Sequence, residues 1–261
     1  MTGETDAQRR RRRYQRALFD GVAQLYQASR LGYSREIVEF IAATAAVSDG
    51  STVLEVGCGT GQLTESLADS GLNLTAIDIG PAMIAAARHR LDGSGVSFQV
   101  TSFEDFTAAE SSIDLIISGA AFHWVDPEVK FSKSARLLRP GGWLAVVDAA
   151  ERYDDPFGAT LRDMWLTYCD SDGAWVNQDL RTAAITDTGL FEEPVYRLDE
   201  RRMTRPVALV IGLENTRATS LSWPDDVRRR FTARLRHELR WQAEVPFTQS
   251  ATLTMARVPQ A

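Results

Sequence analysis

Three glycines stand within five positions in the stretch LEVGCGTGQ, after an apolar run and before a segment of helical character. They are Gly57, Gly59 and Gly61. Residues without a β-carbon permit a tight turn and a close approach of the backbone to a ligand, which the N–H groups of a following helix can also bind. The GxGxxG fingerprint of nicotinamide-binding proteins is not matched, because Gln62 stands where its third glycine belongs. The stretch predicts a cofactor-binding loop that includes Cys58 and Gln62.

Two carboxylates flank this loop and indicate the kind of cofactor. Glu55 lies two residues before the first glycine, where it would repel a pyrophosphate but could accept hydrogen bonds from an ammonium group. Asp78 ends the stretch LTAID, 17 positions after Gly61, where an acidic side chain can accept from both ribose hydroxyls; a helix N-cap is the alternative role. Ile79 and Met83 could lie against an adenine ring. Together these residues predict a cofactor with an adenosine, an amino-acid end and no phosphate.

The chain has three histidines, and His123 is the candidate general base, because only it follows the fourth expected strand, near the cofactor. The alternative is that its ring packs against its own loop and binds a carbonyl group. Asp126, which precedes Pro127, is interpreted as a helix cap.

Four aromatic residues could line an apolar acceptor pocket or form the core of a lid, and the sequence favours neither role. They are Trp124, Trp165, Tyr168 and Trp175.

The elements that must position these residues alternate between strand and helix. Short apolar runs predict strands and 3.6-residue periodicity predicts helices. The expected strands are Thr52–Val56, Leu74–Ile79, Val96–Val100, Asp114–Ser118 and Trp143–Val147, and the expected helices are Gln62–Ser70, Pro81–Leu91 and one that begins at Asp126. This alternation predicts an α/β, Rossmann-like, doubly wound sheet, which binds ligands at the carboxyl ends of its strands.

The flanking segments complete a single domain, 1–261. Its expected parts are an N-terminal helical arm (1–48), a cofactor-binding core (49–150), an inserted lid (151–190) and a C-terminal part (191–261) that completes a mostly parallel seven-stranded sheet. Helices are expected at Tyr14–Arg30, Arg35–Ala46, about Val207–Ala218 and Asp225–Leu239, and further strands at Val195–Met203 and Ala251–Val258.

Composition excludes several classes of protein. The formal net charge of −6 argues against nucleic acid as a partner. The run Arg9–Arg13 is interpreted as a solvated segment, with an anion-binding arm as the alternative. The chain has two cysteines, Cys58 and Cys169, and no CxxC pair, so neither a disulfide scaffold nor a metal site is expected. Because no apolar segment is long enough to cross a membrane, the expected location is the cytoplasm.

The motifs VLEVGCGTGQ, AIDIGPAM and ARLLRPGG together resemble the class I S-adenosylmethionine-dependent methyltransferases, over Phe19 to Val147. The stretch FDGVAQLYQASRLGYS resembles a bacterial small-molecule branch that includes trans-aconitate methyltransferase-like enzymes. The resemblance implies S-adenosylmethionine as the cofactor and S-adenosylhomocysteine as the product. It also implies that Tyr26 and Arg30 close over the methionine end of the cofactor.

The resemblance further implies contacts with the adenine. In VTSFEDF, Ser102 takes the place of an aspartate that accepts from the adenine amine, and Phe103 offers its backbone N–H. Ala120, after the fourth strand, is a further expected cofactor contact.

The expected function is methyl transfer to a small hydrophobic or aromatic metabolite, at oxygen, carbon or nitrogen, in specialised metabolism. Two alternatives remain: a carboxylate O-methyltransferase of trans-aconitate type, and a non-catalytic adenosine-binding subunit. A nicotinamide oxidoreductase is disfavoured by Gln62. A monomer or a homodimer is expected. The carboxylate alternative requires arginines near the acceptor, and the candidates are Arg197, Arg201, Arg202 and Arg205.

Overall fold

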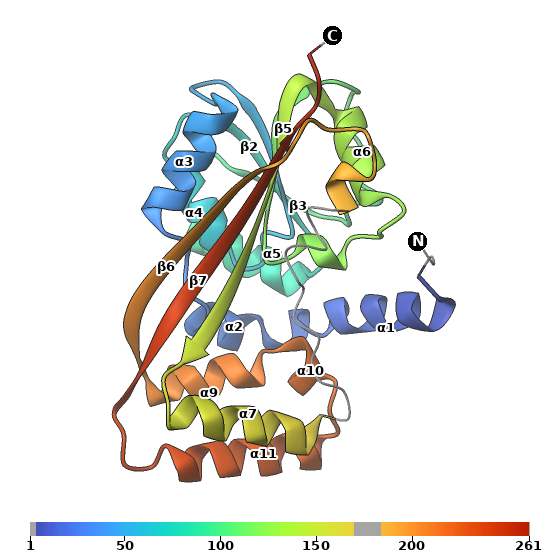
Figure 1. Ribbon diagram of the computed structural model, residues 1–261. Coiled ribbons are helices and arrows are strands. Elements are labelled where there is room, and N and C mark those ends of the chain that lie inside the picture. Colours follow the sequence, from blue (N-terminus) through green and yellow to red (C-terminus); the bar gives the residue numbers. More distant parts are fainter. Residues whose placement is uncertain (1–3, 170–183, 261) are drawn as a thin grey trace.

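The computed structural model describes residues 4–169 and 184–260, and its elements are labelled as in Figure 1. Within these residues, one seven-stranded sheet has the order β3-β2-β1-β4-β5-β7-β6. Strands β1 to β5 are parallel, and β7 is antiparallel to both β5 and β6. The strands are β1 Thr52–Val56, β2 Asn73–Asp78, β3 Ser97–Val100, β4 Ile113–Gly119, β5 Leu138–Tyr153, β6 Val195–Pro206 and β7 Glu244–Arg257. The predicted α/β, doubly wound, seven-stranded fold is confirmed.

Helices cover both faces of the parallel part of the sheet, because side chains along each strand point alternately to the two faces. Val53 and Leu115 pack with apolar residues of α3 and α4. Their neighbours Leu54 and Ile116 pack with residues of α6 on the other face. The helices of this core are α3 Arg35–Ala45, α4 Gln62–Ala68, α5 Pro81–Arg90 and α6 Lys130–Leu137.

Three strands continue far beyond this core. The pairing of β4 with β5 ends at Gly119 and Val147, whereas β5 stays paired with β7 as far as Tyr153, opposite Phe247. The three long strands β5, β6 and β7 run from the core to the far end of the molecule (Figure 1). The predicted strand Trp143–Val147 is therefore too short, because the extension is polar and lacks the apolar run that marks a buried strand.

The long strands end at a helical cap, which comprises α7 Phe157–Tyr168, α9 Val207–Asn215, α10 Ala218–Leu221 and α11 Asp225–Glu238. Phe157, Phe231 and Phe247 lie in its apolar core. Residues after 190 thus build much of this cap as well as complete the sheet, so the cap extends well beyond the lid expected at 151–190.

The N-terminal arm lies between the core and the cap (Figure 1). It consists of α1 Asp6–Ala17, a 3₁₀ turn at Asp20–Val22 and α2 Ala23–Ser29. The run Arg9–Arg13 lies inside α1, whose first turn is closed by a capping box between Thr5 and Gln8. The expected helix Tyr14–Arg30 is interrupted. The arginine run is helical: Arg10, Arg11 and Arg13 are exposed, as a solvated run would be, whereas Arg12 is buried.

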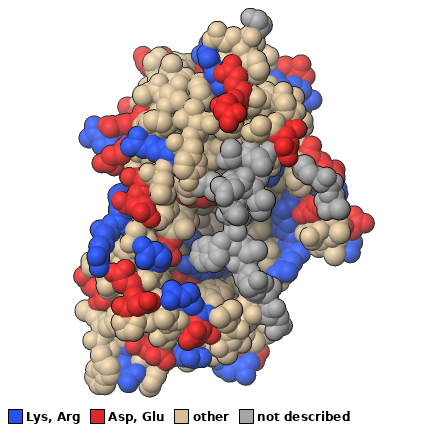
Figure 2. Space-filling model, in the orientation of Figure 1, with Lys and Arg blue, Asp and Glu red and all other residues tan. Residues whose placement is uncertain are grey.

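Charged side chains of both signs are interspersed over the face in Figure 2. Among the residues described, no helix combines the length and apolar character needed to cross a bilayer.

Candidate cofactor site

The glycine loop connects β1 to α4 and has a left-handed backbone at each glycine. The φ angles of Gly57, Gly59 and Gly61 are 73°, 55° and 87°, a region that side chains disfavour. The N–H groups of Gly57 and Cys58 donate to the carbonyl oxygen of Ile77, at 2.8 and 3.0 Å. A β-carbon on Gly57 would lie 2.3 Å from the β-carbon of Ala121. The loop therefore needs glycine both for its turn and for close packing against the segment after β4.

Asp78 fixes this loop from the end of β2. Its Oδ2 accepts from the Gly59 N–H at 3.0 Å and its Oδ1 from the Gly80 N–H at 2.8 Å. Burial raises the pKa of this carboxyl. A carboxylate oxygen can accept more than one hydrogen bond, so Asp78 retains the capacity to bind the hydroxyls of a ligand.

A cavity of about 100 Å³ lies at the carboxyl ends of β1, β2 and β4. It brings together many of the residues predicted from the sequence, namely Tyr26, Gly57, Gly59, Asp78, Ile79, Met83, Phe103, Ala120 and Trp124. It is also lined by residues that the sequence reasoning missed, among them Arg16, Phe19, Asp20, Thr101 and Glu104. Six predicted cofactor residues do not line it: Arg30, Glu55, Cys58, Gly61, Gln62 and Ser102.

Three of these six carry buried polar atoms that have no hydrogen-bond partner among the described residues. The atoms are Oε2 of Glu55, Nε2 of Gln62 and Nε of Arg30. Glu55 is only 1% exposed, and burial raises its pKa to about 7. Buried polar groups usually have partners. An acceptor and two donors that lack them therefore suit a ligand with an ammonium and a carboxylate group.

Tyr33 lies near two of these residues, Glu55 and Arg30, and was missed by the sequence analysis. Its hydroxyl lies against Gly119, where an added β-carbon would be 2.5 Å away. Burial raises the pKa of Tyr33, the nearby Glu55 raises it further, and Arg30 lowers it. The phenol therefore lies within electrostatic range of both Glu55 and Arg30. Its one sequence signal is its position three residues after Arg30.

Tyr26 and Arg30 form a stacked pair on the arm. The guanidinium carbon of Arg30 lies 4.9 Å from the centre of the Tyr26 ring, a cation–π distance. The Tyr26 ring in turn meets Phe19 edge to face, with 5.9 Å between centroids. Because Tyr26 and Phe19 both line the cavity, the arm forms one of its walls.

Ser102, the predicted contact with the adenine amine, is engaged within the protein. The Ser102 hydroxyl donates to Asp105 at 2.6 Å and accepts from the Asp105 N–H at 3.0 Å, so it closes a local turn. Glu104 lines the cavity instead, and its buried Oε2 has no partner among the described residues. Its Oε1 accepts from Arg16 at 2.9 Å and from the Asp126 N–H at 3.1 Å. Glu104 therefore replaces Ser102 as the candidate acceptor for an amine.

The arm also caps α5, through Asp20. Its Oδ1 accepts from the N–H groups of Ala82 and Met83, at 2.7 and 3.2 Å. A β-carbon on Gly80 would lie 2.6 Å from the same oxygen. The residue that accepts these N–H groups at the start of α5 is 62 positions away from Ala82. For that reason no local sequence pattern could reveal it.

Arginines of α1 bind carboxylates and carbonyls of the protein. Arg12 donates to both carboxylate oxygens of Glu4, at 3.0 and 2.9 Å, and to the carbonyl oxygen of Trp124 at 2.8 Å. It also lies 3.4 Å from a carboxylate oxygen of Asp126. Asp126 accepts from the Glu128 N–H at 3.1 Å, but α6 begins four residues later, so Asp126 starts a turn rather than the expected helix.

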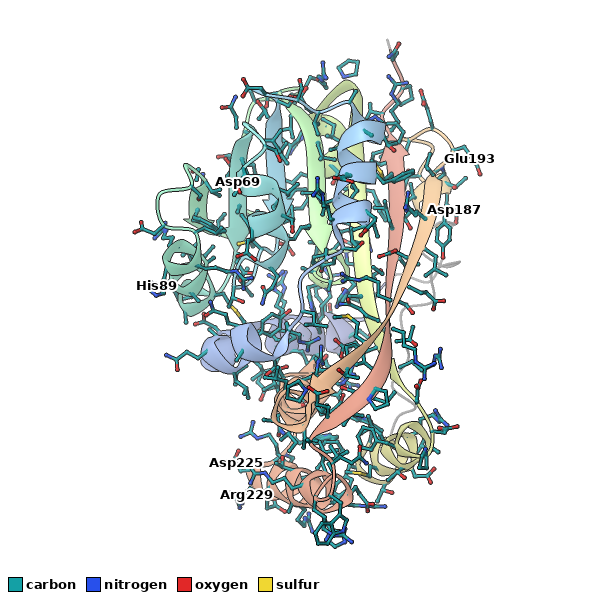
Figure 3. All side chains as sticks on the ribbon, turned by 90° about the vertical axis from the view of Figure 1, so that its left-hand side faces the viewer. Asp69, His89, Asp187, Glu193, Asp225 and Arg229 are labelled. Atoms are coloured by element: carbon teal, nitrogen blue, oxygen red, sulfur yellow. The ribbon has the colours of Figure 1, made fainter. Side chains whose placement is uncertain are left out.

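His123 follows β4, as the sequence predicts. Its ring lies 4.7 Å from that of Trp124, centre to centre, and it is half-buried beside the cavity wall. Of the other two histidines, His89 lies at the outer edge of the core (Figure 3) and His237 on α11 of the cap. The role of His123 as a general base stays a prediction. In the described part of the chain, no cluster of three or more His, Cys, Asp or Glu residues could hold a metal ion.

The predicted aromatic pocket residues separate into two places. Trp124 lines the cavity and meets Phe19 edge to face at 5.8 Å. Trp165 and Tyr168 belong to the core of the cap, with ring centroids 5.2 and 5.5 Å from that of Phe231. Trp175 lies outside the described residues.

The four arginines of β6 all have partners in the protein. Arg197 stacks over Phe40 at 4.7 Å, and Arg201 donates to Gln249 at 2.6 Å. Arg202 donates to Asp154 at 2.7 Å, and Arg205 binds both carboxylate oxygens of Glu151, at 2.9 and 2.7 Å. These contacts leave no arginine cluster on β6 directed at a carboxylate substrate.

The sheet order, the glycine loop and a carboxylate at the end of β2 define an α/β nucleoside-binding fold of methyltransferase type. Residues 54–146 match the family described as "Methyltransferase domain". These residues form a methyltransferase domain, and the fold around them is the Rossmann-like fold of class I methyltransferases.

Curated relatives match part of the chain. An uncharacterized methyltransferase of Mycobacterium tuberculosis is 34% identical over 129 residues, 49% of this chain and 51% of the relative. A malonyl-[acyl-carrier protein] O-methyltransferase of Hahella chejuensis is 34% identical over 43% of this chain and 42% of its own. A ubiquinone biosynthesis O-methyltransferase of Xanthomonas oryzae is 42% identical over 36% of this chain and 41% of its own. The chain thus spans about half the length, or less, of these relatives.

Solved structures show the same fold over most of the chain. A protein described as a type II methyltransferase of Anaeromyxobacter dehalogenans covers 89% of this chain and 99% of its own, with a TM-score of 0.67 and 23% identity. A phosphoethanolamine N-methyltransferase of Haemonchus contortus, in complex with S-adenosyl-L-methionine, covers 92% of this chain and 57% of its own, with a TM-score of 0.54 and 16% identity. At these identities the likeness concerns the fold alone.

Proposed function

We propose that this chain binds S-adenosylmethionine and transfers its methyl group to a small hydrophobic molecule. The observation that carries the proposal is a set of buried polar atoms, on residues of the arm, of β1, of α4 and of the segment after β3, that have no hydrogen-bond partner among the described residues. Glu104 offers an acceptor in the cavity wall. Glu55, Gln62 and Arg30, which do not line the cavity itself, offer a buried acceptor and two buried donors. This pattern is complementary to a nucleoside amine at one end and an amino acid at the other.

Each group of residues would hold a different part of the cofactor. Asp78 would accept hydrogen bonds from the ribose hydroxyls and Glu104 from the adenine amine. Glu55 would pair with the ammonium group, while Arg30 and Gln62 would donate to the carboxylate. The amide oxygen of Gln62 accepts from the Thr60 hydroxyl at 3.0 Å, which leaves the amide N–H donors for the ligand.

When bound, S-adenosylmethionine supplies an electrophilic methyl group on a sulfonium. The protein must align the acceptor with this group and exclude water. The arm contributes to both tasks, because Phe19 and Tyr26 wall the cavity and Asp20 anchors the arm to α5. A hydroxyl acceptor must lose a proton, and His123 is the proposed base for that step.

A hydrophobic or aromatic acceptor and transfer to oxygen are the proposed specificity. Trp124 supports the first choice, because it places an aromatic side chain in the cavity wall. Two relatives named as O-methyltransferases support the second. The trans-aconitate alternative is weakened, because the β6 arginines that it requires bind residues of the protein.

Calorimetric titration with S-adenosylhomocysteine and with NAD⁺ tests the cofactor. We expect the first to bind and the second not to bind. Binding of NAD⁺ alone, or of neither compound, would refute the proposal. Incubation with S-adenosylmethionine and a panel of phenols, amines and carboxylic acids, followed by mass spectrometry, then tests transfer. A gain of one methyl group on a phenol supports the proposed specificity, methylation of carboxylic acids alone supports the trans-aconitate alternative, and tight cofactor binding with no transfer to any acceptor supports a binding subunit.

A further inference from the structure

Arg30, at the end of the arm, contacts two parts of the molecule: the cap, and the Tyr26 ring that lines the cavity. Its Nη2 donates to the carbonyl oxygen of Thr216 at 2.9 Å, directly after α9. Its guanidinium stacks on Tyr26, which lines the cavity. Its Nε is buried and has no partner among the described residues. One planar group therefore binds the cap with one nitrogen and retains a second, unused donor.

The residues around Thr216 are tied firmly into the cap. Glu214, at the end of α9, is fully buried. It accepts from Arg217 at 2.8 and 2.9 Å and from the Trp165 indole of α7 at 2.9 Å. A displacement of Thr216 would therefore be shared by α7 and α9.

The arm and α9 are also in close backbone contact. A β-carbon on Gly212 would lie 2.1 Å from the Ser29 hydroxyl oxygen, and this hydroxyl donates to the Leu25 carbonyl at 2.7 Å. So tight a contact leaves little room for α2 and α9 to move independently.

We propose that Arg30 is a positioning residue that joins the methionine end of the bound cofactor to α9, so that cofactor occupancy fixes the cap. The inference rests on the proposed function. A carboxylate that accepts from Nε would fix the plane of the guanidinium, and Nη2 would then hold Thr216 in one place, because the five donors of arginine lie in a rigid plane. A ligand that has the adenosine but lacks the amino-acid end cannot produce this effect.

Hydrogen exchange with two nucleosides tests the proposal on the wild-type chain. S-adenosylhomocysteine carries the amino-acid end, and 5′-methylthioadenosine lacks it. At saturation, both should slow exchange in the glycine loop, residues 57–61. Only S-adenosylhomocysteine should slow exchange in residues 207–221, by at least about fivefold, the lower end of typical coupling between sites.

Two variants distinguish a specific role of the Arg30 side chain from the general effect of removing one positive charge. In Arg30→Gln, the two nucleosides should protect residues 207–221 equally. Arg35→Gln is the matched control: Arg35 is exposed and pairs with Glu39 on α3, so the difference should persist. If Arg30→Gln does not fold, the comparison of nucleosides on the wild type decides alone.

The outcomes distinguish the two proposals. If S-adenosylhomocysteine does not protect residues 57–61, the proposed cofactor is refuted. Protection of the loop by both, with equal exchange in residues 207–221, would leave the cofactor site intact and overturn the role of Arg30. Retention of the difference in Arg30→Gln would also overturn it.

Discussion

Glu55→Gln should stabilise the unliganded protein in a pH-dependent way. Glu55 is buried, and burial raises its pKa from 4.5 to about 7. The folded chain therefore binds this proton more tightly than the unfolded chain does. The stabilisation from that proton is fully present below about pH 4.5 and is lost as the pH rises through about 7. Glutamine has nearly the same shape and no charge, so it avoids the loss.

The difference between the pKa of Glu55 in the unfolded and in the folded chain sets the size of this pH-dependent change in the free energy of unfolding. Ionised Glu55 lowers the free energy of unfolding by about 3 kcal/mol at pH 8 but by less than about 1 kcal/mol at pH 5. Glutamine has its own constant cost of burial, so the quantity predicted is the difference between the two pH values. The stability of Glu55→Gln relative to wild type should be greater at pH 8 than at pH 5, by about 2 to 3 kcal/mol.

Urea unfolding of both proteins at pH 5 and pH 8 measures this difference. Glu36→Gln is the control, because Glu36 is exposed on α3 and its substitution should show no such dependence. Titration with S-adenosylhomocysteine should show weaker binding to Glu55→Gln at pH 8, since the variant cannot pair with an ammonium ion. An equal stability change at both pH values would refute the argument that Glu55 is held as a buried acid.

Three further substitutions test other parts of the structure. Asp78→Asn should weaken binding of S-adenosylhomocysteine at least about tenfold in calorimetry, because hydrogen bonds to a charged group are lost; unchanged affinity would contradict the ribose role. Glu104→Gln should reduce the preference for S-adenosylhomocysteine over S-inosylhomocysteine, which lacks the amine, by about tenfold; a constant ratio in paired titrations would contradict the amine role. Glu151→Gln should lower the free energy of unfolding by about 3 to 5 kcal/mol in urea, because it leaves Arg205 buried without its counter-ion, and the double variant with Arg205→Met should recover much of the loss.

Local patterns predicted the glycine loop and the carboxylate that follows it. The three glycines need φ angles that only glycine adopts readily, and Asp78 closes the same loop through the Gly59 N–H. Both features lie within one β-α-β unit, where spacing along the chain determines spacing in the fold. This part of the site could therefore be predicted from the sequence alone.

The remaining site residues depend on contacts between distant segments. Asp20 reaches α5, and Arg30 reaches Thr216, 186 positions further along the chain. Such pairs carry no periodic signal. Ser102 was chosen because it stands at the position of an acidic residue in related proteins, whereas the structure presents the acidic side chain two residues later, at Glu104. The burial of Arg12 has the same cause, since its partners are mostly remote in sequence.

The core and the cap share the same long strands, β5, β6 and β7. Strand β7 pairs with β5 without interruption from Arg257 in the core to Phe247 beside the cap, and with β6 from Met255 to Glu244. The family match ends at residue 146, inside β5, so this boundary divides a strand rather than a linker. A fragment cut there would expose an open sheet edge. The cap is therefore better understood as an extension of the sheet than as a separable module.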